Sequence, residues 1–212
     1  MIDRLVKSIE TVIPSIRSVI SKFEDHDIVE EEDSVKLGHR PKIAPMAYAA
    51  HIYQGIDDET ISLYEESNQI LIPAPYKELL NAMNGSRIFR FELFGIPNPG
   101  NPESKAINRS TVRPLDLGTG NRAWINGYNL SSTMFHFGSG PFSFDENVGY
   151  FLSDDNEILS IKKNGEIVGK WHWNQLDQFF EQEIERSEER YKDFEEMMSK
   201  RKPKKPWWKF WA

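Results

Sequence analysis

Apolar residues recur at steps of three and four along residues 2–23, which is the spacing of a helix with one buried face. Pro14 falls inside this stretch and should kink the helix or split it into two pieces. The apolar positions are Ile2, Leu5, Val6, Ile9, Val12, Ile13, Ile16, Val19, Ile20 and Phe23. These positions form an apolar stripe along one side of the helix. The stripe predicts a helix packed on the domain or, alternatively, a helix used for interaction or dimerisation.

A second stripe predicts a long final helix that continues to about residue 198. Asn174 can cap its start, and Asp177 stands three residues later, where a weak capping box would place it. The stripe contains Leu176, Phe180, Ile184, Ser187, Tyr191, Phe194 and Met198. Such a helix spans roughly 35–40 Å, longer than a small domain, so we expect its last turns to pack on the N-terminal helix rather than project.

Short runs of aromatic and branched residues before this helix predict strands. They cover 133–137, 148–152, 157–161 and 166–171, with a further run, partly alternating, over 87–94. Turn signals separate them at Gly138-Ser139-Gly140, Asp154-Asp155-Asn156 and Asn164-Gly165, of which Asn164-Gly165 is the firmest hairpin signal. Residues 97–104 read as a loop, and 106–130 as a short helix between two loops.

Residues 57–85 predict two helices separated by proline. Asp57 and Asp58 can cap the first helix, and Pro73 ends it. Pro73 and Pro75 then set the entry of a second, short helix. Its apolar positions are Tyr76, Leu79, Leu80 and Met83, and Asn84-Gly85 should stop it just before a strand.

This order of elements resembles the SUKH superfamily, which holds bacterial toxin-immunity proteins and fungal regulators of cell-wall synthesis. The matching pieces are Ile61, Tyr64-Glu65, Ile72-Pro73, Tyr76-Lys77, Leu79-Leu80 and Asn84-Gly85. Ser86 stands where the family usually has a second glycine. The resemblance extends to a sheet meander closed by a helix that opens with Trp171-His172-Trp173. The expected fold is α+β: a mainly antiparallel sheet of about five or six strands with helices packed on it, and a long C-terminal helix.

Three regions follow from these patterns. Residues 1–55 are expected to form an N-terminal helical extension with an acidic linker, 56–185 the SUKH-like α+β domain, and 186–212 the end of the final helix and a tail. Seven of the ten residues from Glu24 to Asp33 are acids, which predicts a solvated, mobile linker or, alternatively, a decoy surface for a basic partner. Residues 34–55 are ambiguous between a strand and a short helix.

The charge is unevenly distributed. The formal net charge is −7, and residues 201–212 carry five bases and no acid, which leaves −12 on residues 1–200. An acidic body argues against nucleic acid as the main partner and favours a basic one. The basic aromatic tail, RKPKKPWWKFWA, could contact a membrane surface, nucleic acid or an acidic protein, or its aromatic residues could fold back onto the domain.

The sequence predicts a cytoplasmic protein without a membrane span. It has no cysteine, so disulfides and thiolate chemistry are excluded. Charged residues interrupt the N-terminal stretch where a signal peptide would be apolar, and no run approaches the roughly 18 apolar residues of a transmembrane helix.

No pattern of residues predicts catalysis. The five histidines form no metal-binding pair, so no metal or cofactor is expected, and His136 is read as a packed or surface residue. Asp154-Asp155-Asn156 is a turn rather than a calcium loop. Glu65 is expected to cap or pair inside the fold rather than to catalyse, and an enzyme acting on a small molecule is the weakest of the three functional hypotheses.

The resemblance therefore implies an immunity-type binding protein that neutralises a cognate toxin, with a basic nuclease as the kind of partner that the charge favours. The alternative is a non-catalytic scaffold, as in the fungal members. Candidate contact residues are Trp124 as an anchor and the acids Asp145, Glu146, Asp154, Asp155 and Glu157.

Overall fold

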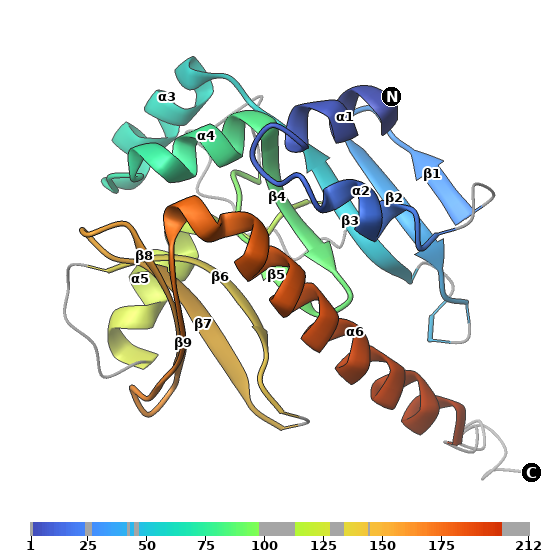
Figure 1. Cartoon of the computed structure of the whole chain (residues 1–212). Helices are drawn as coiled ribbons and strands as arrows, with labels where there is room; N and C mark the ends of the chain where they lie inside the picture. Colours follow the sequence, from blue (N-terminus) through green and yellow to red (C-terminus); the bar gives the residue numbers. More distant parts are fainter. Residues whose placement is uncertain are drawn as a thin grey trace, which may run out of the picture.

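The computed structural model describes residues 2–23, 27–41, 43–44, 47–97, 113–127, 134–143 and 145–200 (Figure 1). Its helices are α1 (Ile2–Ile9), α2 (Ile16–Ile20), α3 (Asp58–Asn68), α4 (Ala74–Ala82), α5 (Leu117–Gly127) and α6 (Leu176–Lys200). Its strands are β1 (Ile28–Glu30), β2 (Ser34–His39), β3 (Tyr48–Gln54), β4 (Met83–Ile88), β5 (Phe91–Leu93), β6 (Phe135–Pro141), β7 (Asn147–Leu152), β8 (Glu157–Lys162) and β9 (Ile167–His172). A 3₁₀ turn, η2 (Trp173–Gln175), precedes α6.

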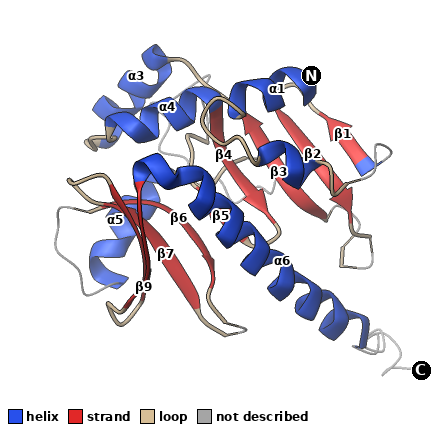
Figure 2. Cartoon of the chain, in the orientation of Figure 1, coloured by secondary structure: helices blue, strands red, loops and turns tan. Residues whose placement is uncertain are grey.

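The expected α+β fold is confirmed, but the sheet has more strands than expected. Nine strands pair in sequence order, each antiparallel to the next (Figure 2). Three of them, β1 to β3, come from residues 28–54, and β3 pairs directly with β4, so the sheet continues across residue 55. The run 87–94 is also divided, because a turn at Phe89 and Arg90 separates β4 from β5.

Part of the predicted acidic linker is ordered structure. Ile28–Glu30 pairs with β2, and the carboxylate of Glu31 accepts from Lys36 Nζ at 2.5 Å. The prediction of a linker was wrong for these residues, because strand pairing and an ion pair offset the repulsion that composition alone suggests. Residues 24–26 lie outside the described residues.

The N-terminal stripe is buried in the chain's own core. Pro14 divides it into α1 and α2 as predicted, and these helices lie with α6 on one face of the sheet, whereas α5 lies on the other (Figure 1). The buried members are Leu5, Val6, Ile9, Ile13, Ile16, Val19 and Phe23. Lys22 Nζ pairs with Glu188 at 2.5 Å, so the segment after α2 contacts the middle of α6. The expectation that the last turns of this helix pack on the N-terminal helix was wrong: these turns extend away from α1 and α2 (Figure 1), and Glu195 pairs with Arg40 at 3.0 Å.

The start of the final helix differs from the prediction. His172, rather than Asn174, caps η2, and the Gln175 side chain completes the capping box. The carboxylate of Asp177 instead accepts from the backbone N–H of Ser15 at 2.8 Å and from its hydroxyl at 2.6 Å. It therefore holds the chain just before α2, a long-range contact that local spacing could not indicate.

The two-helix segment forms as predicted, with different ends. Asp57 caps α3 by accepting from Thr60 N at 2.8 Å, but α3 ends at Asn68, where Gln69 adopts a left-handed φ of 54°. Asn84 and Gly85 do not stop α4, since both lie within β4. The amide of buried Asn84 instead bonds both backbone groups of Ile96, at 2.7 and 2.9 Å.

Of two glycine-containing segments that were predicted to be turns, only one forms a turn. Asn164-Gly165 forms the predicted β8–β9 turn, with Gly165 at φ 88°. Gly138-Ser139-Gly140 is no turn but lies inside β6, beside a register shift between His136 and Gly138. A Cβ on Gly140 would lie 1.9 Å from the hydroxyl oxygen of Tyr150, so glycine is required there by a packed neighbour and not by a turn.

Candidate functional site

The strands of the antiparallel sheet begin and end on two opposite sides, and the turns and helices that connect them lie there. We call the one where α4 enters β4 the α3–α4 edge; it also holds the β7–β8 turn and η2. The opposite one, which holds the β4–β5, β6–β7 and β8–β9 turns, is the β4–β5 edge.

The predicted contact acids are divided between these edges. Asp145 and Glu146 precede β7, whereas Asp154, Asp155 and Glu157 follow it, and the six residues of β7 separate the two groups by about 20 Å. Glu146 lies 3.7 Å from Lys162, and Glu157 pairs with Lys170 at 2.7 Å. Asp145, Asp154 and Asp155 are exposed.

Trp124, the predicted anchor, lies in α5, on the face of the sheet opposite to α6. Its side chain lies outside the described residues. The structure therefore does not gather the predicted residues into one surface.

An exposed leucine lies at the α3–α4 edge, on the same edge as Asp154 and Asp155. The side chain of Leu71 is 83% exposed, although both of its neighbours, Ile70 and Ile72, are also apolar. Trp173 connects the β7–β8 turn to α4. Its backbone N–H donates to Asn156 O at 2.8 Å, and its ring centroid lies 6.3 Å from that of Tyr76 in α4. We call Leu71, Asp154 and Asp155 the Leu71 surface.

Glu65 holds the backbone beside Leu71. Its carboxylate accepts from Ile72 N at 2.7 Å and from Lys77 Nζ at 2.6 Å, so its predicted structural role is confirmed. Ile72 is 1% exposed and the preceding Leu71 is 83% exposed, so the two side chains point in opposite directions, Ile72 into the core and Leu71 outward. Three consecutive apolar residues, Ile70 to Ile72, gave no sign of this exposure in the sequence.

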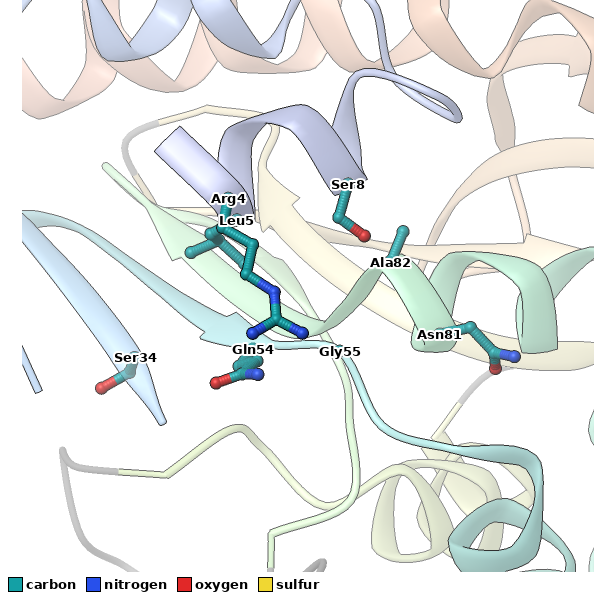
Figure 3. A pocket seen from close by; sticks show the side chains of 8 residues that line it. All are labelled: Arg4, Leu5, Ser8, Ser34, Gln54, Gly55, Asn81 and Ala82. Carbon is teal, nitrogen blue, oxygen red and sulfur yellow. The ribbon is translucent and has the colours of Figure 1, made fainter. Parts of the chain in front are cut away.

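A groove of about 390 Å³ separates α1 from the end of β3 (Figure 3). Figure 3 shows the Arg4 guanidinium extended toward Gln54, with Ser8 and Asn81 nearby. Arg4 makes no ion pair with any described residue. All four side chains are exposed, and the groove is an open set of hydrogen-bond donors and acceptors rather than an enclosed reaction site.

A buried chain of polar side chains crosses β2 and β3. His51 Nε2 lies 3.0 Å from Ser34 Oγ, and His51 Nδ1 lies 3.0 Å from the hydroxyl of Tyr53. Ser34 donates to Glu31 at 3.3 Å, and the hydrogen bond from Lys36 lowers the pKa of Glu31, which keeps this carboxylate an acceptor. Burial raises the pKa of Tyr53, which keeps its proton.

The hydroxyl of Ser34 donates to Glu31, so its oxygen accepts from His51 Nε2. A neutral His51 ring with its proton on Nε2 accepts at Nδ1 from the Tyr53 hydroxyl. In this arrangement His51 does not accept the hydroxyl proton of Ser34, so the pair is not arranged as a nucleophile and its base.

His136 is buried, so of the two predicted environments, packed or on the surface, the packed one is confirmed. Its ring stacks on Phe151 with centroids 4.5 Å apart, and Nδ1 lies 3.2 Å from Gly120 O. Burial lowers its pKa to about 4, so the ring is neutral at pH 7.

No family model, no curated protein and no solved structure matches this chain. Within the described ranges, no group of histidines and carboxylates is arranged to hold a metal ion. No helix in that part of the chain is long and apolar enough to cross a membrane.

Proposed function

We propose that this chain is an immunity-type binding protein that neutralises a cognate basic toxin, for example a nuclease, by direct contact at the Leu71 surface. The observation that carries the proposal is Leu71, an aliphatic side chain 83% exposed on the same edge as Asp154 and Asp155. Neither aspartate makes an ion pair with a described residue.

The chemistry of this surface suits a basic protein. Burying a leucine side chain against a partner is worth about 2 kcal/mol. Unpaired surface carboxylates attract a cationic partner and raise the association rate at low salt. The net charge of −7 acts in the same direction.

The resemblance to the SUKH superfamily supports the same location. Glu65, Ile72-Pro73 and Lys77 are among the matching residues, and they are the residues that hold the backbone beside Leu71. The part of the chain that resembles immunity proteins is thus the part that presents the exposed leucine.

The proposal requires a toxin gene beside this one, and growth rescue from its product and binding to its toxin domain test the proposal. Leu71→Ala should weaken binding about tenfold, since it removes most of the apolar contact. Replacing Asp154 and Asp155 by lysine should lower the association rate and weaken its dependence on salt.

Asp145→Lys is the matched control, because Asp145 is an exposed aspartate at the opposite edge. If the neighbouring toxin domain does not bind, or if Asp145→Lys is as harmful as the double lysine variant, the proposal is wrong.

A scaffold role is the second candidate. It is favoured by the opposite edge of the sheet, where Arg90, which makes no ion pair with another described residue, is a positive group in contrast to the acids of the Leu71 surface. A scaffold would bind two proteins at once, whereas an immunity protein needs one.

A further inference from the structure

A hollow lies between the β4–β5 turn and the last turns of α6. Its volume is about 350 Å³, and it is lined by Arg90, Tyr191, Phe194 and Met197. Arg90 belongs to the turn, whereas the other three residues belong to α6. Apart from the guanidinium and the tyrosine hydroxyl, these side chains are apolar. We call this place the α6 hollow.

Aromatic packing fixes the base of the α6 hollow. Tyr191 is 8% exposed, and its ring centroid lies 5.5 Å from that of Phe89 and 6.4 Å from that of Phe194. The Phe89 ring is also packed against Phe23, with centroids 6.1 Å apart. Phe194 and Met197 are only partly buried, so apolar surface remains uncovered on a base that is already in place.

The side chains around the α6 hollow suit an indole ring. Arg90 makes no ion pair with any described residue, and a guanidinium is attracted to the face of a tryptophan ring more strongly than to other aromatic rings. The sulfur of Met197 and the ring of Phe194 also make favourable contacts with aromatic rings. A tryptophan side chain therefore fits this place better than an aliphatic or acidic one.

The chain itself supplies tryptophans next to the α6 hollow. Residues 201–212 follow α6 directly and contain three of them, although this segment lies outside the described residues. Pro203 and Pro206 favour an end of the helix before Trp207.

The length of this segment allows Trp207 and Trp208 to reach the α6 hollow. Phe194 and Met197 precede the end of α6 by six and three residues, which is about 5–9 Å along the helix axis. Residues 201–206 span up to about 20 Å when extended, which is enough for the chain to reverse and return over that distance.

The charges of the two segments are complementary. Residues 188–196 of α6 carry five acids and two bases, whereas residues 201–212 carry five bases and no acid. Opposite charge draws the tail toward the last turns of α6. Because the tail is part of the same chain, its effective concentration at the hollow is on the order of millimolar, which favours it over an aromatic residue of a separate protein.

We propose that the α6 hollow is the docking site of the chain's own tail, with the Trp207–Trp208 pair packed against Arg90, Phe194 and Met197. The contact goes beyond the proposed function, because it lies at the β4–β5 edge, away from the Leu71 surface, and its occupant belongs to the same chain. It assigns the aromatic residues of the tail to the domain rather than to a membrane surface.

Amide NMR of the full-length chain tests the contact. Replacing both Trp207 and Trp208 by serine should shift the signals of the β4–β5 turn and of residues 191–197, because the rings that cover them are removed. Trp211→Ser is the matched control: it removes a tryptophan from the same tail but leaves the pair, and it should leave these signals unchanged.

A capped peptide with the sequence of residues 203–212 measures whether the hollow is occupied. The peptide should bind the double serine variant with shifts at residues 191–197. It should bind the unaltered chain about tenfold more weakly, because the attached tail competes at a millimolar effective concentration.

Further substitutions in the double serine variant locate the site. Arg90→Ala or Phe194→Ala should weaken peptide binding by about threefold or more, since each removes a contact with the indole rings. Arg4→Ala is the control, because Arg4 also lacks an ion pair with described residues but lies in the groove beside α1, and it should change nothing.

Four outcomes overturn the proposal. The first two are unchanged signals at residues 191–197 in the double serine variant, and equal shifts in Trp211→Ser. The third is equal binding of the peptide by the unaltered chain and the double serine variant. The fourth is binding of the unaltered chain to phosphatidylserine vesicles as tightly as the free peptide binds them, which would assign the tail to a membrane surface.

Discussion

The two edges of the sheet are closed by different interactions. At the α3–α4 edge, side chains bond directly to backbone: the Tyr76 hydroxyl donates to Phe94 O at 2.5 Å and to Phe137 O at 3.2 Å, and Asn84 bonds both backbone groups of Ile96. The β4–β5 edge is closed by rings and ions, with Phe89 packed on Tyr191, and Lys162 lying 4.2 Å from the centroid of the Phe142 ring.

This difference determines which side chains each edge exposes to a partner. Buried hydrogen bonds are directional and costly to break, so they fix the α3–α4 edge and leave Leu71 as an outward side chain on a rigid base. Aromatic packing and exposed ion pairs are less directional and weaker, and Arg90 at this edge makes no ion pair with any described residue.

The largest expected effect comes from removing a buried amide. Asn84→Ala leaves the N–H and carbonyl of Ile96 without partners in a buried site and should lower the free energy of unfolding by about 3 kcal/mol. Asn147→Ala, at the opposite edge, removes an exposed amide and should change it by less than about 0.5 kcal/mol. Urea unfolding measures both. Equal losses would show that the two edges are not held differently.

Acid should loosen β6 and α5 before the β4–β5 turn. Unfolded histidine binds a proton near pH 6.5, whereas His136 does so only near pH 4, because burial lowers its pKa to about 4. Between these values the unfolded state binds more protons, so stability is complete above pH 6.5 and falls as pH decreases toward 4, by up to about 3 kcal/mol.

Amide exchange and urea unfolding across this range would measure the effect. His136→Phe keeps a ring beside Phe151 and should flatten the dependence on pH. An unchanged pH profile in this variant would assign the effect to other groups.

Phe89 tests how the β4–β5 turn is held. Its φ of 55° is unfavourable for phenylalanine, and its ring is packed between Phe23 and Tyr191. Phe89→Ala should cost about 2–3 kcal/mol through lost packing. Phe89→Gly should be about 1 kcal/mol more stable than the alanine variant, because it relieves the strained backbone.

Phe91, two residues later in β5, is the matched control for this comparison. There the order should reverse, with glycine less stable than alanine by about 0.5–1 kcal/mol. Thermal unfolding of the four variants measures the order of stability of glycine and alanine at each position. The same order at positions 89 and 91 would contradict the strain argument.

The smallest expected effect on stability is at Leu71. Since its side chain is 83% exposed, Leu71→Ala should change the free energy of unfolding by less than about 0.5 kcal/mol. Ile72→Ala, one residue further and 1% exposed, should cost about 2–4 kcal/mol. A large loss at Leu71 would mean that this leucine supports the fold and is not available to a partner.

Local patterns in the sequence determined the elements with short-range causes. Proline at 14 and 73, the cap Asp57 and the turn Asn164-Gly165 act within a few residues, so the split N-terminal helix, the start of α3 and the β8–β9 turn could all be predicted. Steps of three and four gave the stripes of the first and last helices, because helical periodicity is a local property.

Only the tertiary structure decided which of these elements meet. The pairing of β1 to β3 with the rest of the sheet, the bond from Ser15 to Asp177, and the glycine at 140 made necessary by Tyr150 depend on residues far apart in sequence. The same holds for function: the acids predicted as one contact surface lie at opposite ends of β7, and Leu71 became visible only through its exposure. Periodicity records which side of an element is buried, whereas long-range packing determines what lies beside it.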